Sequence, residues 1–94
     1  MVRVLIDRRL ASGADDALQR TMREMRGEAI HRPGYVSGET LRDTSDPRHY
    51  VILSTWRSRE EWNVWAVSEA RRRIERQIGQ MLAEPESVTV FEPI

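Results

Sequence analysis

His49–Trp65, HYVILSTWRSREEWNVW, is the stretch that decides how the rest of the chain folds. Residues 49–56 are rich in β-branched and aromatic side chains, which favour a packed strand. Residues 58–61, SREE, then have the S-x-x-E form of a capping box, in which the serine oxygen accepts from a backbone amide and the glutamate reaches back. The stretch therefore predicts a strand that runs directly into a helix.

All three tryptophans of the chain, Trp56, Trp62 and Trp65, fall within this stretch. Trp62 and Trp65 are three positions apart, a spacing that places two side chains on the same helix face. Because an indole N–H needs a hydrogen-bond partner, tryptophan is awkward to bury completely. The cluster is therefore expected to form either the heart of the core or the wall of a pocket.

The composition indicates one domain over residues 1–94 and excludes several kinds of chemistry. All 15 basic residues are arginine, and 15 acidic residues balance them, so charge indicates no nucleic-acid or anionic-membrane partner. Without lysine or cysteine, a side-chain Schiff base, thiolate catalysis and cysteine-bound metals are excluded. No apolar run is long enough for a membrane span and the N-terminus reads as a strand, so a cytoplasmic location is expected.

A strand and a helix are predicted at the N-terminal end. Residues 2–10, VRVLIDRRL, have apolar side chains in both alternating sets, which indicates a strand covered on both faces. Residues 14–30 then place apolar groups at helical spacing, with Ser12 as the expected N-cap. Pro33-Gly34 is expected to end this helix.

Two more strands and a second helix complete the pattern. Residues 35–41, YVSGETL, are predicted as a strand in which Gly38 is a candidate bulge. The helix opened by the capping box extends from residue 58 towards residue 84, and Ser68 is able to cap a second segment after a bend. Residues 87–91, SVTVF, form the last strand.

This order of elements, β-α-β-β-α-β, is the ferredoxin-like pattern and predicts the α+β class. Right-handed crossovers give a four-stranded antiparallel sheet with both helices on one face. The other face is then bare, although the strand at residues 2–10 places apolar groups on it. A second copy of the sheet is the simplest cover, so a homodimer is expected.

Asp7 is unusual because aspartate is disfavoured in the middle of a strand. If it faces the helices, it is a partly buried carboxylate that points into a cavity, with a raised pKa or a paired arginine. The alternative is a structural salt bridge with an arginine. The candidates for that bridge are Arg3, Arg9 and Arg57.

Two other groups of side chains are candidate sites. The second predicted helix carries a run of arginines, for which a solvated face is the plain interpretation and an anion-binding rim beside a pocket is the alternative. The two histidines, His31 and His49, lie on different elements without metal-ligand spacing, so no metal site is predicted. The arginines concerned are Arg71, Arg72, Arg73 and Arg76.

Residues 51–74, VILSTWRSREEWNVWAVSEARRRI, preceded by RPGYVSGE at 32–39, resemble the antibiotic biosynthesis monooxygenase (ABM) domain of the dimeric α+β barrel superfamily. The resemblance extends over nearly the whole chain. Its most specific parts are RPGY, the S-x-W-x-S-x-E-x-W core around Trp56, and the step from Trp65 to Ser68. The resemblance implies a dimeric α+β barrel.

In haem-degrading members of this family, a strand-one asparagine, a helix tryptophan and a helix histidine form the site. Trp65 matches the tryptophan, and the asparagine position falls on or near Asp7. The histidine position offers Ile74, Glu75 or Arg76 instead. Because the axial ligand is missing, haem is not expected, and no cofactor is predicted.

The remaining chemistry implied by the resemblance is a cofactor-independent monooxygenase acting on a small aromatic, quinol-type molecule in a pocket between sheet and helices. The substrate supplies the electrons after losing a phenolic proton, and the protein supplies a dry aromatic cavity. Trp62 and Trp65 are the candidate substrate-binding residues, and Asp7 is the candidate catalytic residue. The alternative is a non-catalytic dimeric module that binds or senses a small molecule, which a pocket filled by its own side chains would favour.

Overall fold

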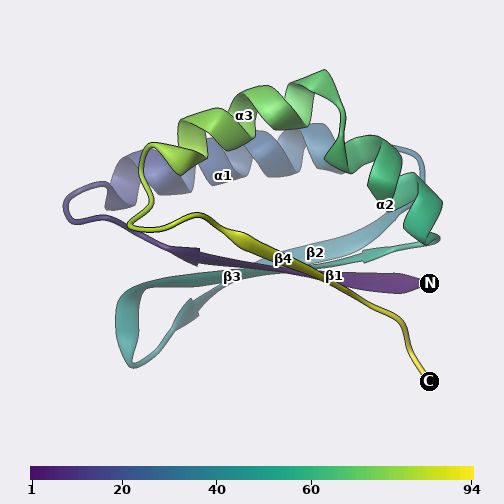
Figure 1. The fold of residues 1–94 in the computed structure, drawn as a ribbon, viewed down its shortest axis with the longest axis horizontal. Coiled ribbons are helices and arrows are strands. Elements are labelled where there is room, and N and C mark those ends of the chain that lie inside the picture. The colour runs from purple at the N-terminus through teal and green to yellow at the C-terminus, as the bar shows by residue number, and fades with distance from the viewer.

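Strand β1 (Val2–Arg9) lies inside the sheet and is paired on both sides. In the computed structural model, which describes residues 1–94, β1 pairs antiparallel with β3 (Asp46–Trp56) and with β4 (Ser87–Phe91). β2 (Tyr35–Asp43) pairs with β3, giving the antiparallel order β2-β3-β1-β4 shown in Figure 1. The predicted α+β, ferredoxin-like fold is confirmed, and the sheet of the single chain is not closed.

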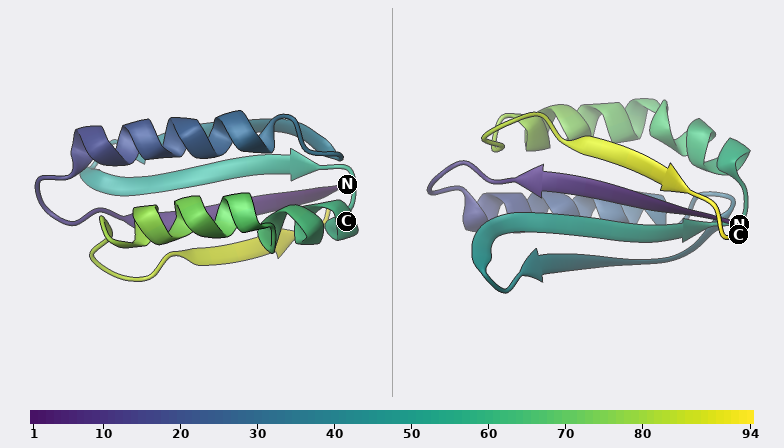
Figure 2. Two further views of the ribbon diagram at one scale, coloured as in Figure 1. Left: turned by 90° about the horizontal axis from the view of Figure 1, so that it is seen from above. Right: turned by 60° about the horizontal axis from the view of Figure 1, so that its bottom comes forward.

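Three helices cover one face of this sheet, α1 (Asp15–Ala29), α2 (Arg59–Ala66) and α3 (Glu69–Gly79). Seen from above in Figure 2, α1 and α3 lie side by side and run along the strands. The second view of Figure 2 shows that no helix covers the opposite face. None of these helices has the length and apolar character needed to cross a membrane.

The second predicted helix is in fact two helices, each with its own serine cap, as the sequence suggested. The Ser58 hydroxyl oxygen accepts from the backbone N–H of Glu61 at 3.1 Å, and Ser68 accepts from the N–H of Arg71 at 3.2 Å. Each bond satisfies a helix-terminal amide that has no partner within its helix. Because of the cap at Ser68, the chain can bend between α2 and α3 without leaving the N–H of Arg71 unpaired.

The predicted extension of this helix to residue 84 is wrong, because α3 ends at Gly79. The carbonyl of Met81 accepts from the N–H of Ala11 at 2.9 Å, and the N–H of Ala83 donates to the carbonyl of Arg9 at 2.8 Å. The backbone after α3 therefore pairs with the segment that follows β1 instead of continuing the helical ladder.

The predicted cap of the first helix is also wrong. The N-cap residue of α1 is Ala14, and no side chain caps this helix. Gly13 turns the chain with φ of 83°, which separates Ser12 from the first helical turn. The Ser12 hydroxyl instead accepts from Arg48 at 3.5 Å.

Gly38 has a role other than the predicted bulge. The register between β2 and β3 shifts between Tyr35 and Ser37, whereas Gly38 sits in the regular ladder opposite Ser54. A Cβ at Gly38 would come within 2.5 Å of the Tyr35 hydroxyl oxygen. Gly38 therefore leaves room for the Tyr35 ring, which packs edge-on against Trp56 with centroids 5.4 Å apart.

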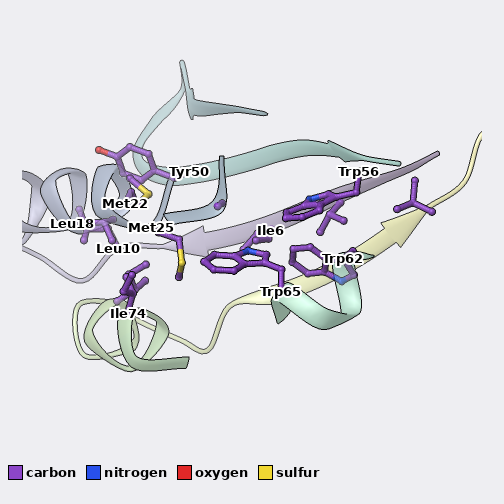
Figure 3. Packing of buried hydrophobic residues seen from close by; sticks show 14 residues of the cluster. Ile6, Leu10, Leu18, Met22, Met25, Tyr50, Trp56, Trp62, Trp65 and Ile74 are labelled. Carbon is purple, nitrogen blue, oxygen red and sulfur yellow. The ribbon is translucent and has the colours of Figure 1, made fainter. Parts of the chain in front are cut away.

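The core fills the space between the sheet and the helices, as Figure 3 shows. Trp56 is only 1% exposed, and its indole N–H donates to the Ser54 hydroxyl at 3.1 Å. Its ring packs edge-on against Trp62 with centroids 5.7 Å apart. The even-numbered residues of β1, among them Ile6, also face this core because side chains alternate along a strand.

Two glycines give a matched test of the backbone. Gly34 has φ of 89°, and a Cβ there would lie 2.5 Å from Cδ of Glu61. Gly34→Ala is expected to lower the free energy of unfolding by about 1–3 kcal/mol, because it strains a left-handed backbone and displaces a capping side chain. Gly27→Ala should instead raise it by about 0.5–1 kcal/mol, since Gly27 is an exposed residue inside α1.

Urea denaturation followed by circular dichroism measures both changes. A Cβ at Gly27 meets no heavy atom within 4 Å, so this variant isolates the propensity of the helix backbone. Effects of the same sign in the two variants would contradict the expectation.

Candidate functional site

A cavity of about 60 Å³ lies between the sheet and the helices. This volume holds a few water molecules, since one water needs roughly 10–15 Å³ on the same measure. Both candidate substrate-binding residues, Trp62 and Trp65, line it, together with two further aromatic rings. The apolar lining is Ile6, Met22, Met25, Ala29, Tyr35, Ile52, Trp56, Trp62 and Trp65.

The candidate substrate-binding tryptophans are held from α2, and each is stacked with an arginine. The guanidinium of Arg32 lies 4.9 Å from the centre of the Trp65 ring, and that of Arg71 lies 5.3 Å from the centre of the Trp62 ring. A cation over an aromatic face is attracted by the ring quadrupole. Figure 3 shows both rings in the group of side chains that contains Ile6.

The cavity reaches the surface between α1 and the edge strand β2. Three of its lining residues, Arg26, Glu39 and Thr40, are exposed, and they come from these two elements. A ring larger than a few waters could enter here only if side chains at this mouth moved. The arrangement thus combines an aromatic interior with a polar entrance.

Two buried arginines add charge to the lining, besides the exposed Arg26 and Glu39 at its mouth. Arg8 and Arg71 are 1% and 4% exposed. The Nε of Arg8 donates to Glu86 at 3.1 Å, and an Nη of Arg71 donates to the other oxygen of the same carboxylate at 3.4 Å. Arg71 also pairs with Glu75. Burial lowers the pKa of Arg8, although Glu86 acts in the opposite direction.

Of these two arginines, the sequence indicated only Arg71 as a candidate. Arg71 belongs to the run for which an anion-binding rim was the alternative interpretation, whereas Arg72, Arg73 and Arg76 are exposed on the solvated face. Arg8 was not predicted. Its position could have been inferred, because it belongs to the alternating set of β1 that faces the helices.

Asp7 lies on the bare face of the sheet, away from this cavity. Its Oδ2 is 3.0 Å from Nε2 of His49, and its pairing partner is neither Arg3, Arg9 nor Arg57. Strand alternation explains the placement, because Asp7 belongs to the odd-numbered set of β1. The structure therefore does not bring the candidate catalytic residue together with Trp65, and the helix-facing orientation considered for Asp7 is not adopted.

His49 bridges two carboxylates on the bare face. Its Nδ1 lies 3.0 Å from Oδ2 of Asp43, in addition to the contact of Nε2 with Asp7. Each contact with a carboxylate requires an N–H, so the geometry favours the imidazolium form. The hydrogen bond to Asp43 is the main cause that raises the pKa of His49, and the bond to Asp7 raises it further. The bond between His49 and Asp43 also lowers the pKa of Asp43.

The stabilising effect of this bridge should depend on pH. Because the pKa of His49 is raised in the folded state, its contribution is present below the unfolded value of about 6.5 and is lost as pH rises through the folded pKa. The contribution of Asp43 is lost as pH falls through its lowered pKa. The stability difference between wild type and His49→Ala should thus be largest in mildly acidic solution and shrink towards alkaline pH.

Chemical denaturation at a series of pH values measures this difference. His31→Ala is the control for losing a histidine, since His31 is exposed and makes no carboxylate contact. A difference that grew from pH 6 to pH 9 would contradict the bridge.

The residues around the cavity do not fit a haem held by a histidine. His31 follows α1 at the surface, and His49 lies on the other face of the sheet. Of the positions where the resemblance places the axial ligand, Ile74 is buried in the core, Glu75 pairs with Arg71, and Arg76 is exposed. No step of a reaction is therefore assigned to haem.

This chain is similar to known proteins in both sequence and fold. The family model described as "Antibiotic biosynthesis monooxygenase" matches residues 1–77. The crystal structure of an antibiotic biosynthesis monooxygenase is 19% identical, with a TM-score of 0.91, over 100% of this chain and 99% of that chain. Rv0793 from Mycobacterium tuberculosis is 22% identical, with a TM-score of 0.89, over 99% of this chain and 94% of that one.

A mutant of SnoaB, a cofactor-independent oxygenase from Streptomyces nogalater, is 13% identical, with a TM-score of 0.86, over 98% of this chain and 92% of its own. No curated protein matches the chain. At these identities the structural similarities show the fold alone. The family model, however, spans the chain from β1 into α3. The chain therefore belongs to the antibiotic biosynthesis monooxygenase family.

Proposed function

We propose that this protein is a cofactor-independent monooxygenase that acts on a small aromatic, quinol-type molecule in the cavity between sheet and helices. The observation that carries the proposal is the aromatic lining of this cavity, to which Tyr35, Trp56, Trp62 and Trp65 all contribute. Family membership supports oxygenase chemistry. The similarity to SnoaB, which is described as a cofactor-independent oxygenase, supports the finer assignment.

The chemistry needs few protein groups. In a substrate of the anthrone type, the methylene carbon of the central ring carries two hydrogens and becomes a carbonyl. One oxygen atom of O₂ enters the product, and the other leaves as water with those two hydrogens. The substrate supplies all the electrons after losing a proton. The cavity contributes by holding the ring in one orientation and by keeping bulk water out of the reaction.

Oxygen uptake with a panel of anthrones and hydroquinones tests the proposal. The protein should accelerate uptake above autoxidation, and ¹⁸O₂ should place one labelled atom in the product. Trp65→Ala should lower the rate by about tenfold or more, because a misplaced ring reacts slowly. The control is Val64→Ala, which changes an exposed neighbour on α2. Uptake no faster than autoxidation across the panel would contradict the proposal.

The small volume of the cavity favours a second candidate, a non-catalytic module that binds or senses an aromatic molecule. About 60 Å³ is available before side chains move, so the site is largely filled by its own residues. Binding of the same panel without oxygen uptake would support this module. Isothermal titration calorimetry beside the uptake assay separates the two functions.

We also propose that the protein works as a homodimer, with a second copy covering the bare face of the sheet. This face carries two apolar pairs, Leu5 opposite Leu53 and Leu41 opposite Val51, and Leu41 is 45% exposed. Packing sheet on sheet would remove this apolar area from water. Sedimentation at micromolar concentration should show twice the 11.0 kDa chain mass, and a single 11.0 kDa species would contradict the dimer.

A further inference from the structure

We propose that Arg8 and Arg71 form an anion subsite in the wall of the aromatic cavity, so that the preferred ligand is an aromatic molecule with an acidic group. A carboxylate or a phenolate on the ring would meet both guanidinium groups. The inference deepens the proposed function by naming a substrate class, and it rests on the same cavity.

The two arginines approach the cavity from opposite layers of the fold. Arg8 projects from β1 in the sheet, and Arg71 lies in the first turn of α3. Both line the cavity, and their side chains are only 2% and 5% exposed. A ligand between the layers would therefore meet two positive charges with little water to screen them.

Two glutamates pair with these two buried cations, but one of them is partly exposed to water. Glu86 is shared between them, and its side chain is 12% exposed. Glu75 pairs with Arg71, but its side chain is 39% exposed, so water screens it. The hydrogen bond of Arg8 to Glu86 runs from Nε, which leaves its terminal Nη groups free to donate to a ligand.

The pKa of Arg8 agrees with this reading of the geometry. Burial lowers it, and this effect outweighs the opposing influence of Glu86. Burying a charge is unfavourable unless an opposite charge lies near it, so a further anion near Arg8 should stabilise the buried guanidinium. A ligand carboxylate or phenolate would supply that charge through charge-assisted hydrogen bonds.

The aromatic and charged parts of the cavity are adjacent. Arg71 stacks on Trp62, and Trp62 lines the same cavity. A ligand ring against Trp62 would thus bring an acidic substituent within reach of the Arg71 guanidinium. For a phenol, two nearby cations favour the phenolate, which is the form that gives electrons to oxygen.

Calorimetric titration with 2-naphthoate and 2-naphthamide tests the subsite, because the two probes share one ring and differ in charge at neutral pH. Wild type should bind 2-naphthoate at least about tenfold more tightly, as expected for charge-assisted hydrogen bonds. Arg71→Gln should reduce this preference towards one, because it weakens the binding of 2-naphthoate more than that of 2-naphthamide. Arg72→Gln, which alters the exposed neighbouring arginine, should keep the full preference.

Glu86→Gln provides a test in the opposite direction. It keeps one acceptor oxygen for the arginines but removes the competing negative charge, so 2-naphthoate should bind several-fold more tightly and 2-naphthamide should not. A general loss of structure cannot tighten one probe selectively. Circular dichroism confirms that each variant is folded.

Four results would overturn the subsite: no binding of either probe, equal affinities in wild type, an unchanged preference in Arg71→Gln, or weaker 2-naphthoate binding in Glu86→Gln. The oxygen-uptake assay tests the proposed function separately. Charge preference without uptake supports the subsite and contradicts the monooxygenase. Oxygen uptake without charge preference supports the monooxygenase and contradicts the subsite.

Discussion

Trp56→Ala is expected to lower the free energy of unfolding by about 3–5 kcal/mol, the usual loss when a buried aromatic ring is truncated to alanine. Trp56 is 1% exposed and packs edge-on against both Tyr35 and Trp62. Truncation would leave a hole between these rings and would remove the donor that now bonds to Ser54. A domain of this kind has about 5–15 kcal/mol in total, so the variant should be marginally folded at 25 °C.

Urea denaturation followed by far-ultraviolet circular dichroism measures this loss without relying on the tryptophan signal that the variant changes. Val64→Ala is the matched control, because Val64 is 68% exposed on α2. Its effect should stay within about 0.5 kcal/mol. A loss below about 1 kcal/mol for Trp56→Ala would mean that the ring does not hold the core together.

Glu86→Ala is expected to cost a similar amount, about 3–5 kcal/mol, because it removes one partner from a buried ionic network. Arg8 would lose the carboxylate with which it pairs, and Arg71 would keep only the half-exposed Glu75. Glu86→Gln should cost less, since its amide oxygen still accepts from a guanidinium.

The control for this prediction is two residues away. Glu84 is 63% exposed and lies 3.9 Å from Arg9, so Glu84→Ala breaks only a surface ion pair. Such pairs contribute about 0–1 kcal/mol. Thermal and urea denaturation of both variants gives the comparison, and equal losses would show that burial does not matter to the network.

Local signals in the sequence predicted the fold well. Ser58 and Ser68 mark the starts of α2 and α3 because a cap depends on residues only three positions apart. The end of α3 was not predictable in this way. It depends on hydrogen bonds from Ala11 and to Arg9, which are remote in sequence.

The candidate site was predicted in part, for a related reason. Trp62 and Trp65 follow a helical spacing, and both reach the cavity. Alternation alone does not decide the face on which Asp7 lies, because both alternating sets of β1 contain apolar residues. Leu10, an apolar residue just after β1, continues the even-numbered set. It therefore favours the even-numbered set, which contains Arg8, as the one that faces the helices. The bond between Arg8 and Glu86 joins residues 78 positions apart, and no local pattern encodes it.

The interior position of β1 also sets the order in which the chain can assemble. β1 precedes the other strands in the chain, yet its neighbours are β3 and β4, with Arg3 opposite Thr55 on one side and Phe91 on the other. The β2–β3 hairpin turns tightly between Asp43 and Asp46, and such local hairpins form within about 1–10 μs. Pairing of distant segments is slower, because a long loop must close first.

On the ribosome, β1 would therefore remain without a partner until β3 has emerged. It would expose the apolar side chains that later face the helices, and a holding chaperone could act during this interval. The ionic link between sheet and helices must wait longer still, since Glu86 follows all three helices in the chain. Folding should accordingly begin at the hairpin and end when β4 joins β1.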